Sequence, residues 1–383
     1  MELLLSDDEQ RMRARLRALV DAQIMPRTAE LDETTEIAWD VAAMLVRERI
    51  IGVVIPEEFG GTGPGVKAAE VCLVREELAR GSANIDLLFT MQGLGSYPIV
   101  AAGSEAQQRR FLPPIARAEK LAGYAITEPA AGSDLSMIET VAERRGASWV
   151  LNGGKIFISN AGAAGIYTVF AKTDPATGVR GLSCFIVEAE TPGFEVVQQY
   201  ELSAPHCIGE LSFRNCAVPA DQIVGEPGHG FRIAMQTFDV FRPSVGAAAI
   251  GMAQAALEES IRYSRTRIQF GHPLIDNQAI QFKLADMATS LEAARMLVYR
   301  AAKLKDRGAA RVTKEASMAK LFATEAAWRA IDEAVQIHGG NGVRRGVRVE
   351  RLYRQVRALR IYEGSSEIQR LIIARHLRQE YEN

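Results

Sequence analysis

The sequence has few cysteines, few histidines and no long apolar run. Its four cysteines, Cys72, Cys184, Cys207 and Cys216, include no CxxC pair, so neither a zinc site nor a disulfide framework is indicated, which fits a reducing compartment. The five histidines show no HExxH or similar spacing, so we expect no metal site. No stretch approaches the roughly 18 consecutive apolar residues of a membrane-spanning helix. These absences exclude several classes of protein.

The chain also lacks a strong charge of either sign. Its net charge is −2 at pH 7 and 24% of its residues are charged, a balance that does not favour a nucleic-acid partner. Residues 1–9 contain too short an apolar run for a signal peptide and are too acidic for a transit peptide. We therefore expect a cytoplasmic location.

Hydrophobic patterning divides the 383 residues into three parts. Residues 1–120 carry helical patterns, residues 121–228 carry short β-rich runs, and residues 229–383 carry long helical patterns. Ser6 and Glu9 predict a capping box, and residues 68–80 and 106–118 predict two further helices. The order predicts an α+β protein with an N-terminal helical domain, a middle antiparallel β domain and a C-terminal helical domain.

The middle and last parts contain the clearest element predictions. Strands are predicted at residues 149–151, 156–159, 167–171, 182–187, 194–197 and 210–213, with Asn152-Gly153-Gly154 as a hairpin turn between the first two. Helices are predicted at residues 231–264, 277–305, 311–337 and 366–377.

Two conspicuous motifs indicate little about function. The glycines of residues 60–65 do not form a clean GxGxxG and lie in no βαβ pattern, so a Rossmann site is not favoured. A run of arginines at helical spacing has a single acid, Glu350, and few interleaved aromatics, so it favours a surface or subunit contact over nucleic-acid binding. The run comprises Arg344, Arg345, Arg348, Arg351, Arg354, Arg357 and Arg360.

Residues 361–370 place an acid, Glu363, at a Gly-bearing break between two helical segments. Ser366 followed by Gln369 predicts a capping box, and the N–H groups at a helix start can hold a negatively polarised oxygen. A carboxylate beside such donors suits removal of a proton from a carbon next to a carbonyl, because the donors stabilise the enolate-like charge. The alternative is an acid that only complements the helix dipole.

Six segments in this order resemble the acyl-CoA dehydrogenase flavoprotein family over essentially the whole chain. They are TEPAAGSD at 127–134, KIFISN at 155–160, FDVFRP at 238–243, RIQFG at 267–271, QIHGGNG at 336–342 and YEGSSEIQR at 362–370. The resemblance implies an N-terminal helical domain, a middle β domain and a C-terminal four-helix bundle. It further implies FAD between the last two domains and a homo-oligomer, usually a tetramer.

The resemblance implies that Glu363 removes the α-proton of an acyl thioester, with coenzyme A as the acyl carrier, while flavin N5 takes the β-hydride. The product would be a 2,3-enoyl thioester. The residues implied to hold FAD are Tyr124, Ile126, Thr127, Ser133, Phe157, Ile158, Ser159, Arg267, Phe270, Gln278, Gln336, Gly339, Gly340, Ser365 and Glu367. Those implied to contact the acyl-CoA are Ser133, Asp239, Arg242, Tyr362, Gly364 and Arg375. The implied electron acceptor is an electron-transferring flavoprotein.

Departures from the family pattern leave alternatives open. Residues 202–208 replace the usual loop near the thioester arm, so the acyl carrier is either coenzyme A or a carrier protein. An oxidase or flavin monooxygenase, and a non-catalytic helical assembly protein, remain alternative functions on the same fold. Residues 82–97 contain no Arg or Lys, so a dicarboxylyl substrate is disfavoured, and the small Gly93, Gly95 and Ser96 favour room for a branched, cyclic or medium-length acyl group.

Overall fold

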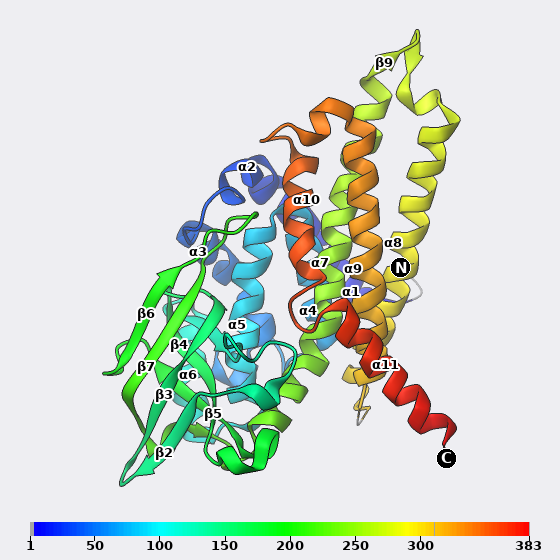
Figure 1. Ribbon diagram of the computed structural model, residues 1–383. Coiled ribbons are helices and arrows are strands. Elements are labelled where there is room, and N and C mark those ends of the chain that lie inside the picture. Colours follow the sequence, from blue (N-terminus) through cyan, green and yellow to red (C-terminus); the bar gives the residue numbers. More distant parts are fainter. Residues whose placement is uncertain (1–3, 310, 383) are drawn as a thin grey trace. The chain divides into compact units, whose positions relative to one another are not determined.

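The computed structural model describes residues 4–309 and 311–382 (Figure 1). Its residues divide into two compact units. The helical unit comprises the chain up to Glu33, Lys67–Asp86, and the chain from Asp239 onward. The β unit comprises Thr34–Val66 and Leu87–Phe238. Helices α5 (Ala83–Ala102) and α7 (Gly230–Thr266) each contribute residues to both units.

The helical unit is built on long helices. Figure 1 shows α7, α8 and α9 side by side, with α10 alongside them. The helices of this unit are α1 (Asp7–Leu19), α2 (Thr28–Leu31), α4 (Ala68–Gly81), α8 (Gln278–Asp306), α9 (Thr313–His338), α10 (Arg348–Leu359) and α11 (Ser366–Tyr381). Buried alanines line one side of α9, among them Ala316, Ala319, Ala323 and Ala327, so neighbouring helices can approach closely.

The β unit contains a sheet of eight strands with the order β6-β7-β3-β2-β4-β5-β8, and β1 pairs with β4. The strands are β1 (Leu121–Ala125), β2 (Val141–Arg145), β3 (Ser148–Ser159), β4 (Ala164–Lys172), β5 (Leu182–Glu188), β6 (Phe194–Gln199), β7 (Ile208–Pro219) and β8 (Ile223–Val224). Most pairs are antiparallel, as predicted, but β1 and β2 each pair with β4 in parallel. Helices α3 (Trp39–Arg47) and α6 (Glu105–Ala116) also belong to this unit.

The predicted hairpin at Asn152-Gly153-Gly154 is wrong. Residues 148–159 form one continuous strand, β3, whose register with β7 shifts between Leu151 and Gly153. Gly153 has a φ of 147°, and a Cβ there would lie 2.5 Å from Thr140 Oγ1. Gly153 therefore permits a β-bulge in β3 and the close approach of Thr140, rather than a turn.

The helix predictions are largely confirmed. The capping box of Ser6 and Glu9 is present, and α4, α6, α7, α8, α9 and α11 match the predicted ranges within a few residues. The cap of α11 was misplaced by one residue, because the hydroxyl of Ser365, not that of Ser366, accepts from Ile368 N–H. Helix α5 was not predicted, since its residues are mostly buried and show no polar face.

The arginine run is predicted to form a surface or subunit contact, and the first of these predictions is wrong for some of its members. Arg348, Arg351, Arg354 and Arg357 are helical, in α10, whereas Arg344, Arg345 and Arg360 lie outside that helix. Arg351 is buried, and Arg348 pairs with Glu259 at 3.2 Å. Arg354 contacts both Glu350 and Glu33 within the helical unit. Several of these arginines therefore form ion pairs within the helical unit. Within the described residues, no helix has both the length and the apolar character needed to cross a membrane.

Candidate active site

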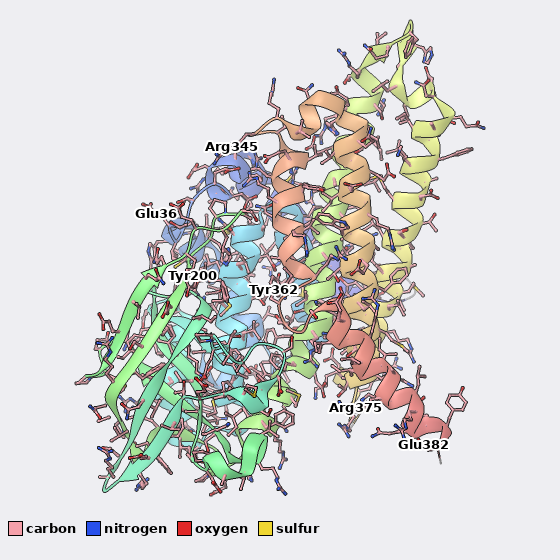
Figure 2. All side chains as sticks on the ribbon, in the orientation of Figure 1. Glu36, Tyr200, Arg345, Tyr362, Arg375 and Glu382 are labelled. Atoms are coloured by element: carbon pink, nitrogen blue, oxygen red, sulfur yellow. The ribbon has the colours of Figure 1, made fainter. Side chains whose placement is uncertain are left out.

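A short loop between α10 and α11 carries Glu363. This residue has a φ of 52°, in the left-handed region, and Gly364 after it has a φ of 90°. A left-handed conformation is uncommon for a residue with a side chain and persists only where surrounding contacts enforce it. Figure 2 shows Tyr362 in this loop and Arg375 further along α11.

Three side chains enforce the conformation of the loop by holding its carbonyl groups. Arg242 Nε of α7 donates to Glu363 O at 3.3 Å, and Lys320 Nζ of α9 donates to Gly364 O at 2.8 Å. Gln369 Nε2 of α11 donates to both oxygens, at 3.2 Å and 2.9 Å. With these carbonyls occupied, the Glu363 N–H finds no acceptor in the described chain. It is therefore available to a ligand oxygen.

Glu325 of α9 anchors both ends of the same loop. Its Oε1 accepts from Arg360 Nε at 2.9 Å, just after α10, and from Ser366 Oγ at 2.5 Å, at the start of α11. Charge-assisted hydrogen bonds of this kind are stronger than neutral ones. Lys320 and Glu325 thus fix the loop to one helix.

The carboxylate of Glu363 is desolvated. Its Oε2 is buried and has no hydrogen-bond partner among the described residues. Burial raises the pKa of Glu363 above its ordinary value, while Arg75, Arg242 and Lys320 act in the opposite direction. A carboxylate with a raised pKa is a stronger base, and it can still be ionised near neutral pH if cations face it.

The other residues implied to contact substrate are only partly brought to this loop. Arg242 is buried and holds the loop, and Tyr362 and Gly364 belong to it. Asp239 lies one turn before Arg242 on α7, where its Oδ1 accepts from Thr313 Oγ1 at 3.0 Å, and burial raises its pKa. Arg375 is exposed on α11, and Ser133 is an exposed residue of the β unit.

In the β unit, the structure brings two of the recognised motifs together. Ile156 N–H donates to Thr127 O at 2.9 Å, and Lys155 Nζ donates to Ile126 O at 3.2 Å. A buried ion pair of 2.6 Å between Lys155 and Glu128 joins the same segments. Residues 126–128 and 155–159 therefore form one continuous surface beside β1, which carries Tyr124.

This surface fits a flavin. Phe157 is 54% exposed at a φ of 54°, an outlying conformation for a bulky residue, and its ring lies 5.2 Å from that of Tyr200. An aromatic ring held outward in this way offers a flat apolar face to an aromatic ligand. Thr127 and Ser159 are half-exposed beside it, whereas the side chains of Ile126 and Ile158 are buried, so only their backbone can reach a ligand.

A second group of implied flavin residues gathers at one end of the helical bundle. The ring of Tyr263 near the end of α7 stacks on that of His338 at the end of α9, with centroids 4.4 Å apart. This contact brings together the segments that carry the exposed Arg267, Phe270, Gln278, Gln336, Gly339 and Gly340. Phe270 is 95% exposed in the hairpin of β9 (Ile268–Gln269) and β10 (His272–Pro273), at the top of Figure 1.

Ser365 and Glu367 lie elsewhere, at the start of α11. Lys320, which contacts Gly364, precedes Gln336 on α9 by a helical distance of roughly 24 Å. One chain therefore places its implied flavin residues at well separated positions within the helical unit.

The described residues contain no group of three or more His, Cys, Asp or Glu side chains arranged to hold a metal ion. A cavity of about 190 Å³ in the β unit is lined in part by three acids, Glu128, Glu139 and Glu210. That lining would repel the phosphates of a nucleotide or a coenzyme A.

Sequence reasoning did not find Arg75, Lys155, Lys320 or Glu325. Arg75, Lys155 and Lys320 are fully buried cations, and Lys320 stands in an otherwise apolar pattern, whereas Arg75 is followed by the buried acids Glu76 and Glu77. Lys320, for example, follows the buried Ala316 and Ala319 and precedes Ala323 on α9. A charge within an apolar stripe is a usable signal, because an ionised side chain is buried only with partners.

Comparison with known proteins shows the family. Models of the acyl-CoA dehydrogenase N-terminal, middle and C-terminal domains match residues 6–119, 123–216 and 228–378. The fold and these matches define a flavin-dependent oxidoreductase that acts on CH–CH bonds, with FAD as its cofactor. The chain belongs to the acyl-CoA dehydrogenase family.

Individual relatives are similar to this protein in sequence or structure over almost the whole chain. An acyl-CoA dehydrogenase of Bacillus subtilis is 42% identical over 369 residues, which cover 96% of this chain and 97% of the relative. The structure of butyryl-CoA dehydrogenase from Megasphaera elsdenii has a TM-score of 0.92 and 38% identity, covering 97% of this chain and 98% of the other. An acyl-CoA dehydrogenase from Bacillus anthracis complexed with FAD has a TM-score of 0.88 and 30% identity, covering 99% of this chain and 68% of the other.

Proposed function

We propose that this protein catalyses the α,β-dehydrogenation of an acyl-CoA, with Glu363 as the catalytic base. The observation that carries this proposal is the pairing, in one residue, of a desolvated carboxylate oxygen without a partner and a backbone N–H without an acceptor. A thioester carbonyl bound by the N–H would lie next to the carboxylate. The same residue would then polarise the carbonyl and remove the α-proton.

The residues around Glu363 prepare this step. Arg242, Lys320 and Gln369 hold the two loop carbonyls, so the N–H points to its ligand before the reaction begins. Preorganised donors stabilise the developing enolate without further rearrangement. The cations that face Glu363 favour its ionised form in the resting enzyme, and burial makes that form a stronger base once the substrate excludes water.

FAD, when bound, would supply the two-electron acceptor for the β-hydrogen of the substrate, which leaves as hydride. We propose that Phe157, Thr127 and Ser159 line the flavin in the β unit, with Tyr124, Ile126, Ser133 and Ile158 contributing to the same wall. The distance along α9 between Gln336 and the loop of Glu363 supports a site completed by a second chain. Arg267, Phe270, Gln278, Gln336, Gly339 and Gly340 would serve the neighbour's FAD, whereas Ser365 and Glu367 would serve the chain's own.

The remaining parts of the proposal concern partners. We propose a homo-oligomer, with a tetramer as the expected form, and an electron-transferring flavoprotein as electron acceptor. Asp239, Arg242, Tyr362, Gly364 and Arg375, together with Ser133, are proposed to contact the acyl-CoA. The exposed guanidinium of Arg375 suits a phosphate of coenzyme A, whereas the buried Arg242 acts on the loop.

The acyl group is best constrained by the butyryl-CoA dehydrogenase relative, and we propose a short or medium-length saturated acyl chain. Gly95, which the sequence suggested as leaving room for the acyl group, instead packs closely against β1. A Cβ on Gly95 would lie 2.6 Å from Ala122 Cβ and 2.9 Å from Gly123 N, so packing against β1 already requires glycine there.

Anaerobic titration of the purified holoenzyme with a panel of acyl-CoAs tests the proposal. We expect one acyl class to bleach the flavin band in the wild type, and Glu363→Gln to retain FAD while losing flavin reduction by at least about a hundredfold. Near-normal reduction in Glu363→Gln would refute the role of the base. No bleaching by any acyl-CoA, with fast reoxidation by oxygen or reduction by a carrier-bound acyl group, would favour the alternative activities.

A further inference from the structure

Behind the catalytic loop lies a buried ion pair that the proposed reaction does not use directly. Arg75 of α4 donates from Nε and Nη2 to the two carboxylate oxygens of Asp86, at 2.9 Å and 2.7 Å. Its Nη1 donates to Ser244 Oγ of α7 at 3.0 Å. The two charged side chains are 0% and 1% exposed. This bidentate geometry holds the guanidinium in one position.

The pair adjoins the loop of Glu363. The hydroxyl of Tyr362, the residue before Glu363, hydrogen-bonds with Arg75. Both members of the pair also act electrostatically on the Glu363 carboxylate, and Arg75 is the cation with the largest effect on it. The charged groups that face Glu363 are thus Arg75 of α4, Asp86 of α5, Arg242 of α7 and Lys320 of α9.

Stability alone does not account for this pair. Moving two charges out of water is costly, and well-packed apolar side chains of similar volume are often equally stable. Arg75 is followed on α4 by the buried acids Glu76 and Glu77, which pair with Arg295 and Arg80, so Arg75 donates instead to Asp86. Besides Asp86, Arg75 acts electrostatically on a second carboxylate, that of Glu363.

We propose that Arg75 and Asp86 are positioning residues that set the protonation state of the base, Arg75 favouring the Glu363 carboxylate and Asp86 limiting that effect. The inference rests on the proposed role of Glu363. Asp86 keeps Arg75 oriented by Coulomb attraction and partly neutralises it, so Arg75 favours the ionised base without holding it in a tight ion pair. A base that is paired too tightly would be a weak acceptor of the α-proton.

Opposite charge changes in the pair provide the test. Arg75→Met should move the acidic limb of the pH profile of flavin reduction to higher pH and slow reduction on that limb by up to about tenfold, since well below the pKa a shift of one unit changes the ionised fraction tenfold. Asp86→Asn should move the same limb to lower pH. Ser244→Ala removes a hydrogen bond but no charge and is the matched control, so its limb should stay with that of the wild type.

Infrared difference spectra provide a second readout that needs no substrate. The carboxyl band that titrates in the holoenzyme but not in Glu363→Gln reports the protonation of Glu363 directly. We expect this band to titrate at higher pH in Arg75→Met and at lower pH in Asp86→Asn. If Arg75→Met fails to fold, Asp86→Asn and the double variant Arg75→Met with Asp86→Asn still supply the comparison.

The outcomes separate the two proposals. If both single variants shift the band in the same direction, or neither shifts it, the role of Arg75 and Asp86 is refuted even though Glu363 remains the base. If the band shifts as expected but Glu363→Gln still reduces flavin normally, the proposed function fails and the electrostatic inference stands only as a property of Glu363. A purely structural pair would lower stability without moving the band.

Discussion

Lys320 and Gly364 are joined by a hydrogen bond of 2.8 Å between the ammonium Nζ and the carbonyl oxygen. The ammonium is buried, and burial lowers the pKa of Lys320 to about 8, with Glu363 opposing that effect. A buried cation on α9 therefore binds the loop that carries Glu363. The contact has two effects, because it holds the peptide and it places a positive charge near the carboxylate.

Lys320→Met should remove both effects. We expect FAD content close to that of the wild type and flavin reduction slower by roughly tenfold, about the effect of one lost positioning hydrogen bond to a charged group. Stopped-flow reduction by the best acyl-CoA measures it. Lys314→Met, on the same helix but paired with Glu380, is the matched control and should react at the wild-type rate. Equal rates for the two variants would contradict the role of Lys320.

Gly364→Ala should distort the loop. The residue has a φ of 90°, and an added Cβ would lie 2.5 Å from Gln369 Nε2. A left-handed conformation costs a non-glycine residue about 1–2 kcal/mol, so we expect a lower melting temperature together with slower flavin reduction. Gly65→Ala is the control, since no atom lies within 4 Å of a Cβ there. If both variants behave like the wild type, the loop conformation is not under constraint.

The pair of Glu128 and Lys155 should be important for stability. Lys155→Met would leave a buried carboxylate without its cation, and loss of one partner of a buried pair typically costs 3–5 kcal/mol, so we expect a decrease of roughly that size in the free energy of unfolding. Urea denaturation of the holoenzyme measures it. The double variant Lys155→Met with Glu128→Gln should regain part of the loss. A double variant less stable than the single one would argue that the pair is not coupled.

The same pair makes a prediction about pH. Although burial raises the pKa of Glu128, Lys155 and the N–H groups of Glu139 and Thr140 outweigh it, and the net pKa lies below its ordinary value of 4.5. An acid whose pKa is lowered by folding contributes stability above the unfolded value and loses it as the pH falls through the folded value. Wild-type stability should therefore fall more steeply below pH 4.5 than that of Glu128→Gln. Parallel curves would contradict this.

Phe157 provides a test of the flavin site that is independent of turnover. Phe157→Ala removes the exposed ring beside Tyr200 and should weaken FAD binding by roughly tenfold, whereas Phe157→Trp keeps an aromatic face and should bind FAD as the wild type does. Fluorescence titration of the apoprotein with FAD measures both. Unchanged affinity in Phe157→Ala would mean that the ring does not face the cofactor.

Residues with a strong local signature were predictable from sequence. The long helices α7, α8 and α9 follow from apolar periodicity, and the acid at the loop follows from a glycine, a hydroxyl and the start of a new helix. These signals predict an acid, Glu363, at the break between two helices, and its role as a base follows only from the resemblance to the family. Its positive φ could not be predicted, because the sequence does not reveal that Arg242, Lys320 and Gln369 converge on the carbonyl groups of Glu363 and Gly364.

What the sequence left open depends on contacts between distant segments. Asn152-Gly153-Gly154 suits a turn locally, but pairing with Cys216 and Phe213 on either side keeps β3 continuous. The ion pair of Arg75 and Asp86 joins two helices, and both of its members act electrostatically on Glu363, which lies far away in the sequence. Local propensity carries no information about such pairs, whereas a lone charge in an apolar stripe can at least indicate where to look for one.

Helix α9 carries Lys320 and Glu325 in its first half and Gln336 near its end, and this limits how its length can change. Each residue added to an α-helix rotates everything beyond it by about 100° and moves it by about 1.5 Å. A single insertion or deletion between Glu325 and Gln336 would turn one group of side chains away from its partners while the other stayed in place. Substitutions in this stretch can therefore be tolerated where a change of length cannot.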